Sequence, residues 1–185
     1  MSITTIDPIT ALVVVDLQEG LRGVSAAHPV AEIVANAAAL ARAFRAKGLP
    51  VALINAVARS PGRVEAARPG FAALPPGWAD LMPELGCQAS DLLITKYTWG
   101  AFHGTPLDLQ LRRRGVTQVV VCGIATSAGV ESTARAAHEH GYHVTLAVDA
   151  MTDLTPLHHR HAVDHVFPRI GETGTAAEVA ARLAG

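Results

Sequence analysis

The sequence has few of the features that mark membrane, nucleic-acid-binding or disulfide-rich proteins. No apolar run approaches the roughly 18 residues of a membrane span, and the first residues lack the basic and apolar regions of a signal peptide. Fifteen basic and 16 acidic residues leave a formal charge of -1, which gives no electrostatic footprint for nucleic acid. The two cysteines, Cys87 and Cys122, do not suggest a disulfide framework. We therefore expect a cytoplasmic protein that binds neither nucleic acid nor membrane.

Aromatic residues are also scarce. They make up 4% of a chain that is 50% hydrophobic, so Ala, Val and Leu must build the core. A chain of 185 residues fits one domain of ordinary size, able to bury about 70% of its unfolded surface. We expect a single domain over residues 1–185.

Short apolar strands alternate with helical patterns along the chain, which is typical of an α/β protein with a parallel sheet. Helices are expected to begin near Val30, Thr105, Ser127 and Pro156, with one more at the C-terminus. The expected strands are 12–15, 51–56, 91–95, one that begins at Val119, 142–148 and 166–170.

A long irregular segment, rich in Pro and Gly, spans residues 58–90. Long irregular segments in compact domains are usually functional. Phe71 and Trp78 provide apolar anchors that could cover a pocket or pack on a partner subunit. A plain surface loop is the alternative.

The most informative segment is VVVCGIATSAGVESTARAA, from Val119 to Ala137. A β-branched strand breaks at Gly123, and a helix of small residues follows, which is where α/β enzymes commonly place a nucleophile. The segment resembles the isochorismatase-like hydrolases (the cysteine hydrolase superfamily), whose turn reads roughly Gly-Val-x-Thr-x-x-Cys-Val-x-x-Thr-Ala. Gly129 stands at the position of the nucleophilic cysteine. The matching residues are Gly123, Ile124, Thr126, Val130, Thr133 and Ala134.

Three further segments extend the resemblance over residues 11–153. Asp16 ends the first strand as the family's aspartate does, Lys96 begins a segment similar to the family's lysine segment, and 149–153 matches the exit from a later strand. The resemblance implies a three-layer α/β/α, Rossmann-like fold with a six-stranded parallel sheet in the order 3-2-1-4-5-6. Asp16 and the turn after Gly123 would then meet where the strand order reverses, the usual ligand position in such sheets.

The resemblance implies two kinds of chemistry. In members that carry the cysteine, a thiolate attacks an amide, with the aspartate as proton acceptor and the lysine stabilising charge. Glycine removes this covalent route. True isochorismatases also carry glycine at this position and cleave a vinyl ether, a reaction that needs a proton delivered to the methylene carbon. We therefore expect a hydrolase of a small, anionic metabolite, with Asp16 as general acid/base, Lys96 as the orienting charge and Gly129 at the vacated position.

Another reading stays open. A member that has lost activity would keep Asp16 and Lys96 as a structural ion pair and act as a small-molecule binding or scaffold module. Cys122, inside a predicted strand, is expected to behave as a small buried hydrophobe and not as a relocated nucleophile.

The resemblance also implies a substrate site around these residues. Isochorismatases carry a Gln-Pro pair after the second strand. In this chain Asn55 could offer an amide there, at a position offset by one. A non-proline cis peptide is implied at Ile124–Ala125, and the backbone N–H groups of Ala125 and Gly129 could bind an oxyanion or a substrate carboxylate. The expected substrate-binding residues are Gln18, Asn55, Trp99, Phe102, His103, Ile124, Ala125 and Ser127.

Neither a metal nor another cofactor is expected. Four of the nine histidines, His158, His159, His161 and His165, cluster on a predicted helix, but zinc needs three or four converging ligands and no HExxH pattern is present. A solvated helix face is the preferred interpretation. The family usually oligomerises, so we also expect a homo-oligomer, a dimer or larger.

Overall fold

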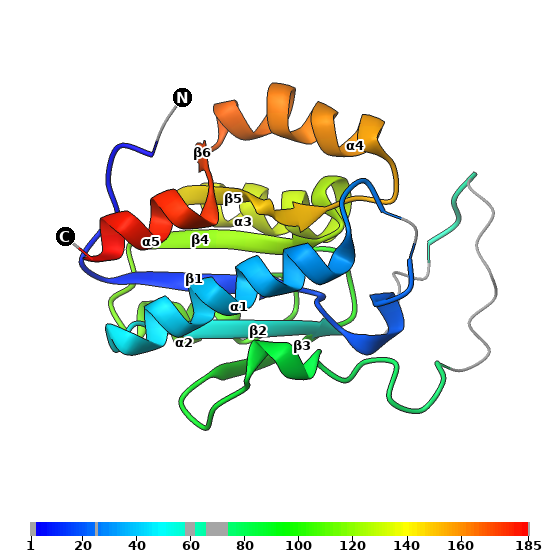
Figure 1. The fold of residues 1–185 in the computed structure, drawn as a ribbon, viewed down its shortest axis with the longest axis horizontal. Helices are drawn as coiled ribbons and strands as arrows, with labels where there is room; N and C mark the ends of the chain where they lie inside the picture. The colour runs from blue at the N-terminus through cyan, green and yellow to red at the C-terminus, as the bar shows by residue number, and fades with distance from the viewer. Residues whose placement is uncertain (1–2, 25, 58–61, 66–73, 185) are drawn as a thin grey trace.

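A six-stranded parallel sheet forms the centre of the structure, a computed structural model that describes residues 3–24, 26–57, 62–65 and 74–184. The strand order is β3-β2-β1-β4-β5-β6, and every neighbouring pair is parallel (Figure 1). The predicted fold class and strand order are thus confirmed. The strands are β1 (Thr10–Val15), β2 (Val51–Ala56), β3 (Leu92–Lys96), β4 (Gln118–Ile124), β5 (His143–Thr152) and β6 (Glu172–Gly174).

Helices cover both faces of the sheet (Figure 1). On one face, α1 (Val30–Ala46) and α5 (Ala176–Ala184) pack over a core that includes alternate residues of β1, β2 and β4. On the other face lie α2 (Leu107–Arg112), α3 (Glu131–Glu139) and the segment after α4 (Pro156–His161). All six residues of β1 are buried, as expected for a strand covered on both faces. Within the described residues, no helix is both long and apolar enough to cross a membrane.

The predicted last strand, 166–170, is wrong. Val166 ends a π-helical turn (Ala162–Val166), and a 3-10 turn (Phe167–Arg169) follows it. Val166 and Phe167 lie in helical turns, and their side chains are buried in the core. They are apolar because they pack against the sheet, not because they form one of its strands. The last strand is instead β6, three half-buried residues without an apolar run.

Gly123 allows β1 and β4 to lie side by side at the point where the strand order reverses. It pairs with Val15, the residue before Asp16, and its φ is +125°. A Cβ built on Gly123 would lie 2.0 Å from the Val15 carbonyl oxygen. A side chain here would therefore force apart the two central strands directly beside Asp16.

Replacing Gly123 with alanine is expected to destabilise the protein by about 3 kcal/mol or more, because the new methyl group overlaps the backbone of β1. Gly48→Ala is the matched control: Gly48 also has a positive φ, +67°, but no atom lies within 4 Å of the built Cβ. Its expected cost is about 1 kcal/mol. Urea unfolding of both variants measures the difference, and equal losses would contradict this account of Gly123.

Candidate active site

A buried ion pair lies at the carboxyl end of the sheet. Asp16 follows the last residue of β1, and Lys96 is the last residue of β3, with β2 between the two strands. The Lys96 side chain reaches across, and its Nζ lies 2.8 Å from Asp16 Oδ2. Lys96 is 2% exposed and Asp16 7%. The structure thus brings together two residues that are 80 positions apart in the sequence.

The Asp16 carboxyl group is only half compensated. Oδ2 pairs with Lys96, whereas Oδ1 is buried and has no hydrogen-bond partner among the described residues. Burial raises the pKa of Asp16 to about 6, and the charge and hydrogen bond of Lys96 act in the opposite direction. Asp16 also has a φ of +55°, a left-handed conformation that is uncommon for a residue other than glycine. Such strain and unsatisfied polar atoms concentrate at functional sites.

The turn after β4 lies against this carboxyl group. A Cβ built on Gly129 would come 3.1 Å from Asp16 Oδ2 and 3.1 Å from a Val15 methyl group, so any side chain here would contact the carboxylate. Gly129 belongs to a π-helical turn, Thr126–Val130, which leads into α3. The Ile124–Ala125 peptide bond before it is cis, which confirms that expectation. Lys96 and the Gly129 backbone therefore both lie beside the Asp16 carboxyl group.

The two amide side chains predicted to bind substrate are engaged with the protein itself. Gln18 donates to the carbonyl oxygens of Ala56 and Trp78 and accepts from the Ala56 N–H. Asn55 donates to the Ala79 carbonyl and accepts from the Thr95 hydroxyl. Both amides join the carboxyl ends of the strands to neighbouring loops, and the structure gives them no contact with the Asp16 carboxyl group.

Part of the 58–90 segment packs beside the site. Residues 78–82 run antiparallel to 17–20: Gly20 N–H donates to the Trp78 carbonyl, and Met82 N–H donates to the Leu17 carbonyl. The Trp78 indole covers Gly20, where a built Cβ would overlap the ring. Trp78 is thus an anchor of this segment within the chain, while Phe71, the other predicted anchor, lies outside the described residues.

The remaining predicted substrate-binding residues divide between the site and other regions. Ile124 ends β4, Ala125 follows it after the cis bond, and Ser127 belongs to the turn. Trp99, three residues after Lys96, is exposed, as is His103. Phe102 lies elsewhere: its ring packs on His140 and Tyr142, next to the amino end of β5. The structure therefore does not bring Phe102 to Asp16.

The expected solvated histidine face is correct for three of the four residues and wrong for the fourth. His158, His161 and His165 are exposed, whereas His159 is buried and forms a hydrogen bond with the Thr126 hydroxyl. The spacing of histidines along the sequence shows which of them share a helix face. It does not show that α4 packs on the turn that contains Thr126, so this contact was not predicted. Among the described residues, no group of three potential metal ligands converges.

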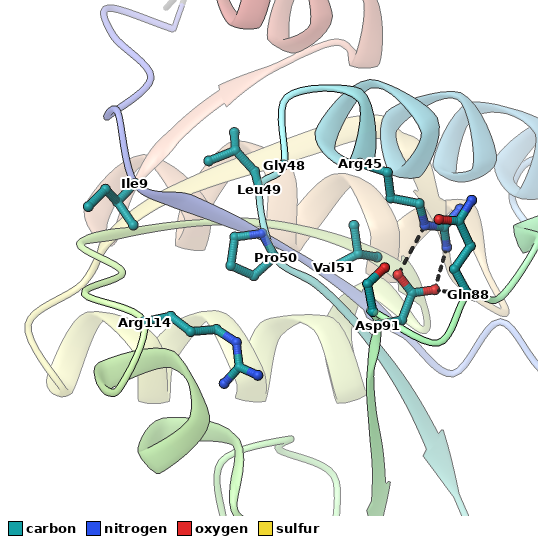
Figure 2. Close-up of a pocket in the computed structure, with 10 residues that line it drawn as sticks. Ile9, Arg45, Gly48, Leu49, Pro50, Val51, Gln88, Asp91 and Arg114 are labelled. Carbon is teal, nitrogen blue, oxygen red and sulfur yellow. Dashed lines mark hydrogen bonds and ion pairs between the residues drawn. The ribbon is translucent and has the colours of Figure 1, made fainter.

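A separate pocket of about 600 Å³ lies at the opposite end of β1, β2 and β3. Figure 2 shows its buried ion pair, in which Arg45 Nη2 lies 2.7 Å from Asp91 Oδ2, and the Arg114 guanidinium on another wall. The Arg45–Asp91 pair fixes the last turn of α1 to the residue before β3. This pocket is a strand length away from Asp16 and is distinct from the candidate active site.

The site has the position and composition of an active site in a doubly wound α/β enzyme: charged side chains and a helix-start turn meet where the strand order reverses. A model of the isochorismatase domain matches residues 10–178. The chain belongs to the isochorismatase family, a family of hydrolases.

Individual relatives agree with this assignment. The isochorismatase family protein YwoC of Bacillus subtilis is 42% identical over 175 residues, covering 91% of each chain. An isochorismatase family protein from Burkholderia thailandensis has a structure that superimposes with a TM-score of 0.94, at 41% identity over the full length of both chains. The ureidoacrylate amidohydrolase RutB of Methylorubrum extorquens is 31% identical over 184 residues, with 80% of this chain and 71% of that protein covered.

Removing the Lys96 charge is expected to raise the pKa of Asp16 above about 6, because the lysine opposes the effect of burial. Lys96→Met keeps the length of the side chain, and carbon-13 NMR of the carboxyl group measures the change. Arg45→Met is the control, since it removes a buried cation at the other end of the sheet. A pKa that falls or stays constant in Lys96→Met would contradict the assigned electrostatics.

Proposed function

We propose that this protein hydrolyses a small, anionic metabolite without a thiol nucleophile, with Asp16 as the general acid/base and Lys96 as the orienting charge. The observation that carries the proposal is the Asp16 carboxyl group, which is buried and has one oxygen without a protein partner in the described structure. Burial raises the pKa of this group to about 6, which favours the protonated form that a general acid needs.

The two carboxyl oxygens have different surroundings, which fits a proton donor. Lys96 lies against Oδ2, where a positive neighbour disfavours protonation, so the proton belongs on Oδ1. Asp16 Oδ1 would deliver it to the methylene carbon of a vinyl ether, and water would capture the resulting oxocarbenium ion. The ether oxygen then leaves as an alcohol when the hemiketal collapses.

Lys96 and the turn would bind the substrate. Lys96 Nζ contacts Asp16 Oδ2 and donates to the Thr98 carbonyl, so these two protein partners occupy two of its three N–H donors. The third donor, with the backbone N–H groups of Ala125 and Gly129, would bind a carboxylate or a developing oxyanion. The amidohydrolase relative is named for a ureidoacrylate, which is itself a small carboxylate, and this supports an anionic substrate.

Gly129 supports a non-covalent reaction. Since a Cβ at this position would already lie 3.1 Å from Asp16 Oδ2, glycine keeps the approach to the carboxyl group open. The cysteines present offer no substitute. Cys122 is fully buried, and burial raises the pKa of its thiol to about 12. Cys87 is exposed and stands next to Gln88, which lines the pocket at the opposite end of the sheet. We further propose that the protein acts in the cytoplasm as a single-domain protein and a homo-oligomer, without a metal or cofactor.

The test is a screen of small anionic vinyl ethers, amides and carbamates with the native protein and Asp16→Asn. The amide cannot donate an acidic proton, so turnover should fall by a factor of about 10² to 10⁴. Because the protonated carboxyl group is the active form, kcat/KM should decrease as the pH rises through about 6. The control Cys87→Ser/Cys122→Ala should keep full activity.

Two outcomes would contradict the proposal. Loss of activity in the double cysteine variant would indicate a thiol reaction. Saturable binding of a compound without turnover of any would favour the alternative, a binding module that keeps the Asp16–Lys96 pair as structure.

A further inference from the structure

Behind the turn that carries Gly129 lies a cluster of polar side chains that the proposed reaction does not use. Thr126, the second residue after the cis peptide bond, is completely buried, and its hydroxyl lies 2.9 Å from Nδ1 of His159 on α4. His159 is itself 8% exposed. A fully buried hydroxyl on an active-site turn, matched to a buried imidazole from another helix, indicates a specific contact.

The surroundings keep the His159 ring in place and uncharged. The ring of His28, from the loop before α1, meets it edge-on with centroids 4.7 Å apart. His28 is held in turn by two hydrogen bonds to the Thr152 side chain at the end of β5. Burial, with a smaller contribution from His28, lowers the pKa of His159, so one ring nitrogen donates and the other accepts at neutral pH.

Asp153 holds the next residue of the same turn. Its Oδ2 accepts a hydrogen bond of 2.6 Å from the Ser127 N–H, and it is 2% exposed. At the other end of the turn, the Thr133 hydroxyl donates to the Gly129 carbonyl. The backbone from Thr126 to Gly129 is thus held at both ends, and two of these contacts, His159 to Thr126 and Asp153 to Ser127, come from elements outside the strand-turn-helix unit.

We propose that His159 is a positioning residue, which acts through Thr126 to hold the 126–129 turn against Asp16 and keep water from the carboxyl group. The exclusion of water matters for catalysis only if Asp16 is the general acid, so this inference rests on the proposed function. The expected mechanism is local: Gly129 lies so near Asp16 that a Cβ built on it would come 3.1 Å from Oδ2, so we expect the burial of Asp16 to depend on the turn remaining there. If the turn moves outward, water reaches the carboxylate.

The test measures the pKa of Asp16 by carbon-13 NMR and needs no substrate. Thr126→Val and His159→Leu remove the contact while keeping the volume, and each should lower this pKa by about one unit, because water replaces part of the covering turn. Thr126→Ser keeps the hydroxyl, and His159→Asn places a polar atom close to the position of Nδ1. Both should leave the pKa near that of the native protein.

His161→Leu is the matched control, since it changes an exposed histidine of the same helix and should not alter the pKa. Thermal unfolding of each variant is measured alongside. A lower melting temperature with an unchanged Asp16 pKa in Thr126→Val and His159→Leu would show a purely structural contact and overturn the proposal. So would equal shifts in the conservative variants or in the control.

Thr126→Val removes a single hydroxyl, so it carries the test alone if His159→Leu does not fold. Failure of this proposal is distinguishable from failure of the proposed function: Asp16→Asn reports on catalysis, whereas the pKa series reports on the turn whether or not a substrate is turned over.

Discussion

The candidate site depends on one constraint: Asp16 must remain buried beside Lys96 with only one of its two oxygens neutralised. A fully paired carboxylate would be a stable structural ion, and a solvated one would have an ordinary pKa. Here the effect of burial on the pKa is larger than the opposing effect of Lys96, so the pKa of the carboxyl group is raised to about 6. The strain in the Asp16 backbone and its unpartnered Oδ1 are consistent with a group held for chemistry.

Much of the surrounding structure maintains this arrangement. Gly123 allows the β1 and β4 backbones to meet next to Asp16, and Gly129 approaches the carboxylate without a side chain. The Gln18 amide joins the exit of β1 to the end of β2, across which Lys96 must reach. The fold therefore supplies three separate elements to one small volume, which is why residues far apart in sequence form the site.

The sequence predicted the features that follow from local pattern and from family resemblance. Buried apolar runs located the first five strands, and the matched motifs identified the residue pair and the turn. The failures have physical causes: β6 contains no apolar run, and Val166 and Phe167 are buried through helical backbone. Other contacts arise from tertiary packing, which the spacing of residues in the sequence does not predict. One is the hydrogen bond between His159 and Thr126, and others are those of the Gln18 and Asn55 amides with backbone groups.

The central claim is that Asp16 gives a proton to substrate carbon in a site without a thiol. Hydrolysis of an anionic vinyl ether in deuterium oxide tests it directly, with the product analysed by proton NMR and mass spectrometry. The account predicts one deuterium on the former methylene carbon for the native protein, and no enzymatic turnover for Asp16→Asn. Hydrolysis without deuterium on that carbon, equal turnover by the two proteins, or no hydrolysis of such an ether by the native protein would contradict it.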